Sequence, residues 1–520
     1  MPDILTTHAE ANPGAAAVIV DEVGGARPST TSFAELEAMA TRLAAGLVAR
    51  GAAPGDRLVW CGPNSLEVLV VLHAARKAGM VAVPLSYRFH AEEMAYVIDN
   101  SDATVVIADS EQAPLIASVR DHLPKVGTFV AYEALAEPVG LPQGFEPLEA
   151  VLAAGETATF AEPDEVVGAQ MLYTSGTTGR PKGALRTRTD PAVVFALLGE
   201  LGLRFGEEVH LTTGPLYHSG PLAFATIAHS LGGPIVVMRR FDPQAWLRLV
   251  REHRVTNTFS APTQLKRIVS LPAAELAAAD CSSMRCLVAN AAPVPYALKQ
   301  QVIATLGDGF LFEVYGSTEL GIITVLRPED QLRKPGSCGR PYGGIEVRIV
   351  RDDGTDAPPG EPGELFMSSA LAMDGYHKTA EQLTELDAGR WKSVGDVAYL
   401  DDEGYVYICD RKKDMIISGG VNIYPAEIEA VLHEHPAVLD AAVIGIPDDE
   451  WGERVHCIVQ PHPDRPLDLA ELQAFVEARV ARYMRPRGYE VRDSLPRTEA
   501  GKLLKRVLRD EYWAGRDRRV

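Results

Sequence analysis

Short apolar runs rich in β-branched residues alternate with amphipathic helical stretches through the first two thirds of the chain. The runs are Val105–Ile107, Pro234–Val237 and Arg285–Val288, and the helical patterns include Phe33–Arg50 and Ala245–His253. Parallel strands joined by crossover helices produce this alternation, because each strand buried on both faces is followed by a helix that covers the sheet. The pattern therefore predicts an α/β architecture.

The pattern changes from about Gly339 onward, where short alternating strands are separated by Gly and Pro turns. Ile345–Val350 and Glu364–Met367 are predicted as strands of a small β subdomain, and Ala398–Cys409 as a hairpin. Beyond the hairpin, a compact α/β unit is predicted.

The last hundred or so residues contain two predicted helices, Pro425–Glu434 and Leu469–Arg479. A chain of 520 residues is also longer than one hydrophobic core usually organises. We therefore predict a large N-terminal α/β domain with a small β subdomain (residues 1–410), a hinge (411–415) and a small, mobile C-terminal α+β domain (416–520).

Composition restricts the classes of function. The formal net charge of −20 provides no diffuse positive field for nucleic acid, so phosphates must be met by a local site. Residues 1–13 lack the apolar core of a secretory signal, and no apolar stretch is long enough to span a membrane. A cytoplasmic protein is expected. Six cysteines without C-x-x-C spacing are expected to be reduced and mostly buried: Cys61, Cys281, Cys286, Cys338, Cys409 and Cys457.

The segment Leu172–Gly183 (LYTSGTTGRPKG) is the strongest chemical signal. Glycines and small hydroxyl residues let main-chain N–H groups close around a phosphate, and Lys182 supplies a mobile cation. The spacing differs from that of a Walker A loop. For any five of these residues alone, a turn between a strand and a helix would be the better interpretation.

At this segment the sequence resembles the adenylate-forming superfamily, which includes acyl-CoA synthetases, aryl-CoA ligases, luciferases and peptide-synthetase adenylation domains. Further matching segments follow in the family's order, and together they are more specific than any one alone. They are Ala78–Leu85, Pro215–Gly220, Tyr315–Glu319, Gly395–Asp396, Asp410–Arg411, Ser418–Gly420 and Pro496–Lys502.

The resemblance implies an ATP-dependent acid–CoA ligase that uses Mg²⁺. Thr318 would lie near the α-phosphate, and Glu319 would hold the Mg²⁺ ion as a hard oxygen ligand. Taken alone, Glu319 would be read as a solvated acid at a helix start. The residues implied to cradle the β- and γ-phosphates are Thr174, Ser175, Gly176, Thr177, Thr178 and Lys182.

The nucleoside would be held by residues from several segments. Tyr315, followed by Gly316, resembles the ring that stacks on adenine, and Asn290-Ala291-Ala292 would run along the other purine edge. Asp396 and Arg411 resemble the ribose-binding pair. Taken singly, the tyrosine would be a core residue and the two charges a surface ion pair.

Lys502 is the candidate catalytic residue for the first half-reaction, bridging the acid and the α-phosphate. A basic helix start is the alternative interpretation. In the family the C-terminal domain rotates after adenylation, with Lys413 at the matching hinge position. The rotation would present Gly419 and Gly420 to the thiol channel.

Coenzyme A is the expected acyl acceptor, with Trp451 and the basic segment Arg482–Arg487 as candidate contacts. Both could equally belong to a solvated face or to interdomain packing. His218 is a candidate catalytic residue between the acyl and thiol sites, although a lone histidine is more often structural. The apolar segment Gly220–Ala225 suggests a roomy pocket for a hydrophobic carboxylic acid.

Two positions depart from the family pattern: Asn290 replaces a common glycine, and Val394 replaces a common threonine before Gly395. Alternative functions are loading of a carrier protein, or thioester formation on an adenylate supplied by a partner enzyme. A non-catalytic nucleotide sensor is disfavoured because Lys182, Glu319 and Lys502 are all present. A homodimer is compatible with the resemblance.

Overall fold

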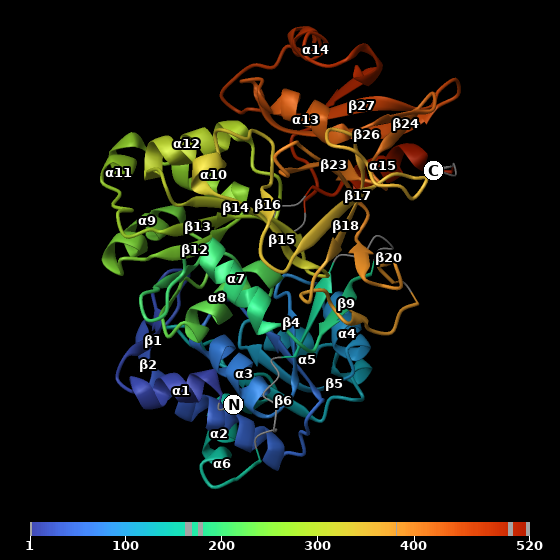
Figure 1. Cartoon of the computed structure of the whole chain (residues 1–520). Helices are drawn as coiled ribbons and strands as arrows, with labels where there is room; N and C mark the ends of the chain where they lie inside the picture. The colour runs from blue at the N-terminus through green and yellow to red at the C-terminus, as the bar shows by residue number, and fades with distance from the viewer. Residues whose placement is uncertain (1–2, 162–168, 175–179, 381, 498–502, 516–520) are drawn as a thin grey trace.

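The computed structural model of the 520-residue chain describes residues 3–161, 169–174, 180–380, 382–497 and 503–515. Four β-sheets with flanking helices make up this part of the chain (Figure 1). The three sheets formed before residue 412 belong to the large N-terminal α/β domain, and the fourth to a small C-terminal α+β domain. The predicted fold class is confirmed.

Two large sheets form the body of the N-terminal domain. The first is largely parallel and has the strand order β16 (Arg340–Pro341), β15 (Gly321–Leu326), β14 (Leu311–Ser317), β13 (Cys286–Ala289), β12 (Asn257–Ser260), β10 (His210–Thr212), β11 (Ile235–Val237), β1 (Ala16–Val20) and β2 (Ser29–Ser32). The second has the order β19 (Gly375–Tyr376), β9 (Lys182–Arg186), β8 (Gln170–Thr174), β4 (Val81–Leu85), β3 (Arg57–Cys61), β5 (Ala103–Asp109), β6 (Thr128–Tyr132) and β7 (Glu146–Pro147).

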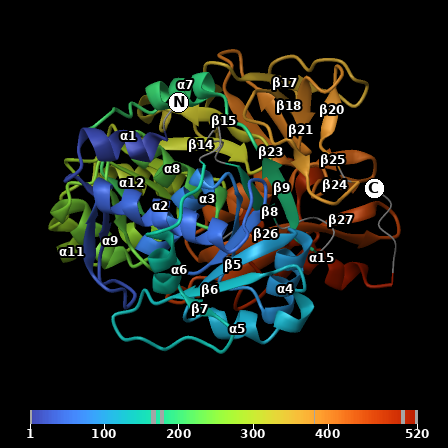
Figure 2. The ribbon, with the colours of Figure 1, turned by 90° about the horizontal axis from the view of Figure 1, so that it is seen from below.

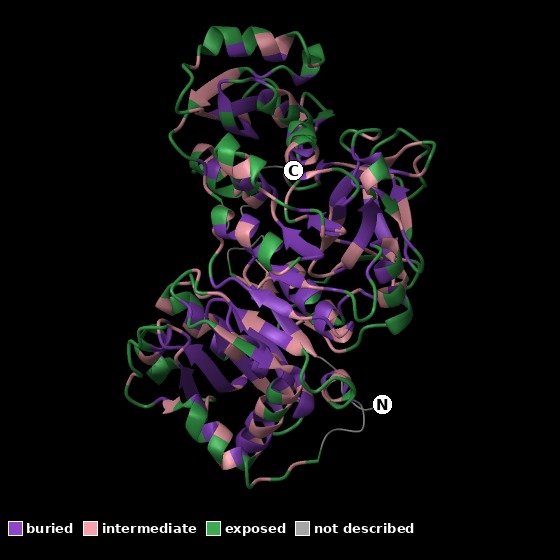
Figure 3. Cartoon of the chain, turned by 90° about the vertical axis from the view of Figure 1, so that its left-hand side faces the viewer, coloured by how far each residue is buried: buried purple, intermediate pink, exposed green. Residues whose placement is uncertain are grey.

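Helices α2, α3 and α8 lie between these two sheets (Figure 2). One apolar core joins side chains of the three helices to β1 and β11 of the first sheet and to β3 and β5 of the second. Ser32 caps the N-terminus of α2 in a capping box: its side chain accepts from the main-chain N–H of Glu35, and the Glu35 side chain accepts from that of Ser32. Because the core lies between the sheets, buried residues follow the strands and the inner helix faces (Figure 3).

The helices before residue 412 are α1 (Ile4–Ala11), α2 (Phe33–Ala49), α3 (Leu66–Lys77), α4 (Ala91–Asn100), α5 (Ala113–Ala117), α6 (Leu148–Gly155), α7 (Pro191–Glu200), α8 (Ser219–Ser230), α9 (Pro243–Glu252), α10 (Pro262–Val269), α11 (Ala273–Ala277) and α12 (Tyr296–Leu306). The predicted helices at α2 and α9 are confirmed, and the three predicted strands correspond to β5, β11 and β13. The six cysteines are buried and free, as expected.

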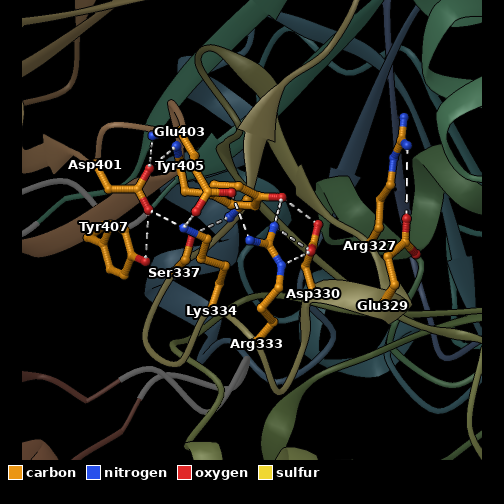
Figure 4. A network of polar contacts seen from close by, with 11 residues as sticks. Arg327, Glu329, Asp330, Arg333, Lys334, Ser337, Asp401, Glu403, Tyr405 and Tyr407 are labelled. Atoms are coloured by element: carbon orange, nitrogen blue, oxygen red, sulfur yellow. Dashed lines mark hydrogen bonds and ion pairs between the residues drawn. The ribbon is translucent and has the colours of Figure 1, made fainter.

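A third, antiparallel sheet forms the predicted β subdomain. Its strands are β17 (Glu346–Val350), β18 (Gly363–Ser368), β20 (Thr384–Leu386), β21 (Trp391–Ser393), β22 (Asp396–Leu400) and β23 (Val406–Arg411). The hairpin of β22 and β23, which we call the ribbon, leads directly into the residues between the two domains. Asp401 and Glu403 in its turn bind Lys334 and Arg333, with Lys334 Nζ 2.7 Å from Asp401 Oδ2 (Figure 4).

The C-terminal domain contains the fourth sheet, with β24 (Ile416–Ser418), β25 (Val421–Ile423), β26 (Val438–Asp448), β27 (Gly452–Pro461) and β28 (Gly488–Val491). Its helices are α13 (Pro425–His433), α14 (Leu469–Glu477) and α15 (Lys505–Trp513). The two helices predicted here are confirmed within two residues at each end. The boundaries 410/411 and 415/416 stay a prediction.

Candidate active site

A cavity of about 2660 Å³ opens between the two large sheets and extends to the C-terminal domain. The large domain lines it with the ends of β8 and β14, with β15, and with α7 and α8. The C-terminal domain lines it with Arg497 and the start of α15. The cavity is therefore bounded by both domains.

A carboxylate held by two hydroxyl groups lies in the wall of this cavity. Thr174 Oγ1 donates to Glu319 Oε1 at 3.1 Å, and the Tyr376 hydroxyl donates to the same oxygen at 3.0 Å. Lys182 Nζ lies 5.7 Å from the centre of the Tyr376 ring. Two separate segments thus bring hydroxyls to one carboxylate, and a cation from a third lies beside the Tyr376 ring.

The structure contradicts two simpler interpretations of this region: a helix-start acid for Glu319, and a strand-to-helix turn for the segment that contains Lys182. Glu319 lies in the turn between the antiparallel strands β14 and β15, so the helix-start interpretation is wrong. Lys182 begins a strand, β9, that pairs antiparallel with β8, so the turn between a strand and a helix is wrong as well. Ser175, Gly176, Thr177 and Thr178, predicted to bind phosphate, lie outside the described residues.

Thr318 connects this carboxylate to helix α8. Its hydroxyl lies 3.0 Å from the Ser219 hydroxyl at the first turn of α8, and its main-chain carbonyl accepts a hydrogen bond of 2.9 Å from Arg186. Thr318, Ser219 and Arg186 all line the cavity. A row of polar groups therefore runs from Glu319 to the N-terminus of α8.

The predicted nucleoside residues Tyr315, Asp396 and Arg411 lie together. The Tyr315 hydroxyl donates to Asp396 Oδ2 at 2.5 Å, and Arg411 Nε is 3.1 Å from Asp396 Oδ1. Burial, reinforced by the adjacent Asp396 carboxylate, raises the pKa of Tyr315 well above its usual value. Asp396 and Arg411 are cross-strand partners in the ribbon, so their pairing follows from strand register.

The Asn290-Ala291-Ala292 segment follows β13 at the cavity edge. The Asn290 side-chain amide donates to the main-chain carbonyl of Val314 on the neighbouring strand β14. Ala291 has φ of +79°, a left-handed conformation that is unfavourable for a residue with a Cβ atom. Asn290 and Ala291 line the cavity together with Gly316. Val394, the other departure, packs with apolar residues of the core below β14 and β15.

An apolar region of the cavity lies between α7, α8 and β15. The rings of Phe224 and Phe259 are 5.4 Å apart, and a Cβ atom at Gly220 would lie 2.4 Å from the Phe259 ring. Glycine is therefore required at this position by a close approach. The apolar side chains lining this region are Val194, Leu197, Leu198, Phe224, Ile227 and Ile322.

His218 precedes α8 and lines the cavity beside Tyr217. Its ring centre lies 4.3 Å from that of Tyr217, which in turn packs edge-on against Tyr87. The Nε2 atom of His218 is buried and makes no hydrogen bond within the described part of the chain. Burial, with a further contribution from Arg88, lowers its pKa to about 4, so the imidazole is neutral at ordinary pH.

The C-terminal domain is connected to the end of the ribbon by charged contacts. Asp410 Oδ2 accepts a hydrogen bond from the main-chain N–H of Ala426 at 3.1 Å and lies 3.5 Å from Lys505 Nζ. Lys505 also lies 3.0 Å from Glu429. Burial disfavours the ammonium form, but the carboxylates of Glu429 and Asp410 outweigh this effect and raise the pKa of Lys505.

Ion pairs lie on both sides, in sequence, of residues 498–502, which include Lys502. Arg497 lies 2.9 Å from Asp440 on the N-terminal side, and Lys505 is held as above on the other. Lys502 itself lies outside the described residues. Arg509 of α15 donates to the main-chain carbonyl of the predicted hinge residue Lys413 at 3.2 Å and to Asp414 at 3.1 Å.

Three predicted coenzyme A residues gather elsewhere in the C-terminal domain. The N–H of Gly419 donates to the main-chain carbonyl of Trp451 at 2.8 Å, and a Cβ atom at Gly419 would collide with the Trp451 ring. The guanidinium group of Arg487 lies over the Trp451 ring, with its Cζ atom 4.7 Å from the ring centre. Among the placed residues that line the cavity, Gly419, Gly420 and Trp451 are absent.

Sequence reasoning missed Tyr376, Arg186 and Ser219. Tyr376 follows Gly375 in a short strand that pairs with β9, a connection that no local pattern indicates. Ser219 lies within the predicted segment Pro215–Gly220 without having been given a role, and Arg186 lies three residues after Leu172–Gly183; the inward orientation of both depends on the tertiary structure.

The residues fit a magnesium ion held largely by a phosphate chain. Mg²⁺ commonly binds one or two carboxylates plus substrate phosphates and water, rather than a protein cage. Glu319 provides one such carboxylate with its second oxygen free of the Thr174 and Tyr376 bonds. Clusters of three or more His, Cys, Asp or Glu side chains suited to a metal do not occur in the described ranges. None of the helices there is long and apolar enough to cross a membrane.

Known proteins match both parts of the chain. The AMP-binding enzyme family matches residues 5–377, and the AMP-binding enzyme C-terminal domain matches residues 427–502. A feruloyl-CoA synthase of Amycolatopsis sp. is 37% identical, over 92% of this chain and 94% of its own length. A fatty acid–[acyl-carrier-protein] ligase of Streptomyces coeruleorubidus is 32% identical, over 99% of this chain and 96% of its own length.

A solved structure agrees in overall geometry as well. The ATP-bound MatB from Rhodopseudomonas palustris superposes with a TM-score of 0.86 at 28% identity, over 98% of this chain and 99% of MatB. The family match, the two-domain fold and the shared cavity lead to one assignment. This chain belongs to the AMP-binding, adenylate-forming enzyme superfamily, in its ATP-dependent, AMP-forming acid–CoA ligase branch.

Proposed function

We propose that the enzyme joins a hydrophobic carboxylic acid to ATP, releases pyrophosphate, and passes the acyl group from the adenylate to coenzyme A. The main support is the polar row from Glu319 through Thr318 to Ser219, which borders the apolar region between α7 and α8. A triphosphate and an apolar acid could therefore meet at Thr318.

In the adenylation step, an oxygen of the acid attacks the α-phosphorus and the bond to the bridging oxygen of pyrophosphate breaks. Two anions must approach each other, so the site has to hold both in line and neutralise their charge. Lys182 and residues 174–178 would bind the β- and γ-phosphates, while Tyr315, Asp396 and Arg411 would hold the nucleoside. When bound at Glu319, Mg²⁺ supplies further neutralisation of the phosphate chain. Lys502 would bridge the acid and the α-phosphate.

After adenylation, the C-terminal domain would rotate about Lys413. The separation of Gly419, Gly420 and Trp451 from the cavity supports this step, since a second orientation is needed to bring them to the acyl group. The contacts of Asp410 with Ala426 and Lys505 would have to break, because they join residues on opposite sides of Lys413.

In the thioester step, the thiol sulfur attacks the adenylate carbonyl and AMP leaves with the bonding electrons. His218 is our candidate for accepting the thiol proton. Its neutral imidazole lines the cavity, and its Nε2 atom makes no hydrogen bond within the described residues, which supports this role.

The six apolar side chains named above support a hydrophobic acid as the substrate. The two relatives act, by their names, on a feruloyl group and on a fatty acid, so aryl and long-chain acids are both candidates. A carrier protein is the alternative acceptor, because one of these relatives is named as a carrier-protein ligase.

The test is pyrophosphate release from ATP and Mg²⁺ with fatty, aryl and bulky polycyclic acids, with and without coenzyme A. Acid-dependent pyrophosphate together with an acyl-CoA detected by mass spectrometry is expected. Pyrophosphate without thioester would favour a carrier protein. If thioester formed only from a supplied acyl-adenylate, the proposed adenylation activity would be wrong.

A further inference from the structure

Arg186, the last residue of β9, carries a guanidinium group that faces the cavity without a carboxylate partner. One terminal nitrogen donates to the main-chain carbonyl of Thr318 at 2.9 Å, while Nε is buried and bonds no other group. Within the described ranges no acid lies within ion-pair distance of Arg186. A permanently charged side chain is thus largely removed from water and left with one neutral partner.

Another buried arginine shows how this chain neutralises such a charge for structural purposes. Arg239 is fully buried and pairs with Asp109 at 2.9 Å and with Glu111 at 2.5 Å. Leaving a buried charge uncompensated is strongly unfavourable, so structural arginines are usually paired in this way. Arg186 lacks the arrangement that Arg239 has.

Asp374 and Glu319 are the two carboxylates whose charge acts on Arg186, and both already accept hydrogen bonds from other groups. Asp374 accepts hydrogen bonds from the main-chain N–H of Thr187 at 2.6 Å and from its hydroxyl at 2.8 Å. Glu319 accepts from Thr174 and Tyr376, as described above. Both carboxylates act on Arg186 through space, but within the described ranges neither forms a direct ion pair with its guanidinium group.

The position of Arg186 along β9 separates it from the phosphate-binding lysine. In the hairpin, Lys182 is paired with Thr174, and Arg186 is paired with Gln170 four residues farther along. At about 3.3 Å per residue, the two backbone positions are about 13 Å apart. Lys182 lies beside Tyr376, whereas Arg186 reaches Thr318. The two cations therefore face different parts of an extended ligand.

We propose that Arg186 binds the oxyanion at the reaction centre beside Thr318, either the α-phosphate of the nucleotide or the carboxylate of the acid. Both anions offer oxygens that match the N–H fork of a guanidinium. Arg186 belongs to the large domain, so it stays at the reaction centre when Lys502 is withdrawn. The acid part of this proposal rests on the proposed function, whereas the phosphate part requires nucleotide binding alone.

The test compares ligands that differ only in the anion. Calorimetric titration gives the affinities of AMP and adenosine, and of the best-used acid and its methyl ester, for the full-length enzyme. Arg186→Met removes the charge and keeps the length of the side chain. Arg204→Met is the matched control, because it removes the same charge from an exposed side chain outside the residues that line the cavity. Thermal unfolding checks that each variant is folded.

A charge-assisted hydrogen bond of this kind corresponds to about 10- to 100-fold in affinity. If Arg186→Met weakens the binding of AMP by this factor and leaves the affinity for adenosine unchanged, Arg186 binds the phosphate. If it weakens the acid and leaves the ester and AMP unchanged, Arg186 binds the carboxylate. Equal weakening of AMP and adenosine would overturn the proposal in favour of a structural role at the Thr318 carbonyl, and so would no change in any ligand.

Two further arrangements keep the test decisive. If Arg186→Met does not fold, Arg186→Lys serves instead: it keeps the cation but lacks the Nε donor, and about a fivefold selective loss of AMP or acid binding is expected. No selective loss would overturn the proposal. If wild-type enzyme uses no acid in the panel, the proposed function fails, while the AMP and adenosine comparison still decides the role of Arg186.

Discussion

The large domain and the C-terminal domain contribute to the cavity in different ways. On the large-domain side, hydroxyl groups hold the key carboxylates in place, as Thr174 and Tyr376 do for Glu319 and Tyr315 does for Asp396. The C-terminal domain is instead joined across Lys413 by charges at Asp410 and Lys505. One half of the site is thus preorganised, and the other is held by contacts that can be exchanged for water.

The largest effect is expected at Lys502 in the C-terminal domain, the half of the site that is proposed to move. Lys502→Ala should lower acid-dependent pyrophosphate release by about 10²- to 10³-fold, because a cation that stabilises the transition state is lost. Thioester formation from a supplied acyl-adenylate should be nearly unchanged. The two rates are measured separately, with Lys266→Ala, an exposed lysine of α10, as control. Equal loss in both steps would contradict the proposed division of labour.

The second-largest effect is expected from the contact between Asp410 and Lys505, which joins the two domains. Asp410→Asn removes a charge that holds Lys505 and should weaken the adenylation orientation by about 1.5–3 kcal/mol. Pyrophosphate release is then expected to fall by about tenfold or more, with the thioester step from supplied adenylate maintained. Asp414→Asn is the matched control, since its partner Arg509 lies on the same side of Lys413. If both variants reduced both steps alike, Asp410 would have no orienting role.

The pH dependence of the thioester step sharpens the comparison on the large-domain side. Because burial lowers the pKa of His218 to about 4, its imidazole stays neutral down to about pH 5. A histidine with the ordinary pKa of about 6.5 would lose about tenfold of its basic form at pH 5.5. The rate from supplied adenylate should therefore lack a break near pH 6.5. A break there that disappears in His218→Gln would show that the imidazole is not desolvated.

The smallest effect is expected within the preorganised half. Tyr376→Phe removes one of two hydroxyl bonds to Glu319 and should cost about 0.5–1.5 kcal/mol. The Mg²⁺ concentration for half-maximal pyrophosphate release should rise by about two- to tenfold. Tyr407→Phe, which removes a phenol bound to Asp401 in the ribbon, is the control. An unchanged Mg²⁺ dependence would separate Tyr376 from the metal site.

The order of elements was predictable from sequence because hydrophobic period and turn residues are local signals. Predicted α13 agrees with the structure to one residue, since Pro425 begins it and the apolar face continues to its end. Strand direction was less accessible. The antiparallel pairing of β8 with β9 depends on contacts with neighbouring strands, which is why the segment containing Lys182 was compared with a turn between a strand and a helix.

Residues within quoted motifs were found more readily than their partners. Asp396 and Arg411 were predicted as a pair, and the register of the ribbon places them opposite each other. Tyr376 reaches Glu319 only because its short strand is added to the edge of β9. Such a contact joins residues far apart in sequence, and a single sequence carries no local signal for it.

If Asp396 and Arg411 hold the ribose as proposed, the ribbon of β22 and β23 would make nucleotide occupancy and domain orientation parts of one equilibrium. Its turn is clamped by Arg333 and Lys334 (Figure 4). Asp396 is the proposed ribose ligand, and Asp410 contacts Lys505 of the C-terminal domain. Linkage is reciprocal: if a bound ribose favours one ribbon geometry, the domain orientation that favours this geometry retains the nucleotide more tightly. Release of AMP and return of the small domain would then be a single coupled event, with no separate sensor required.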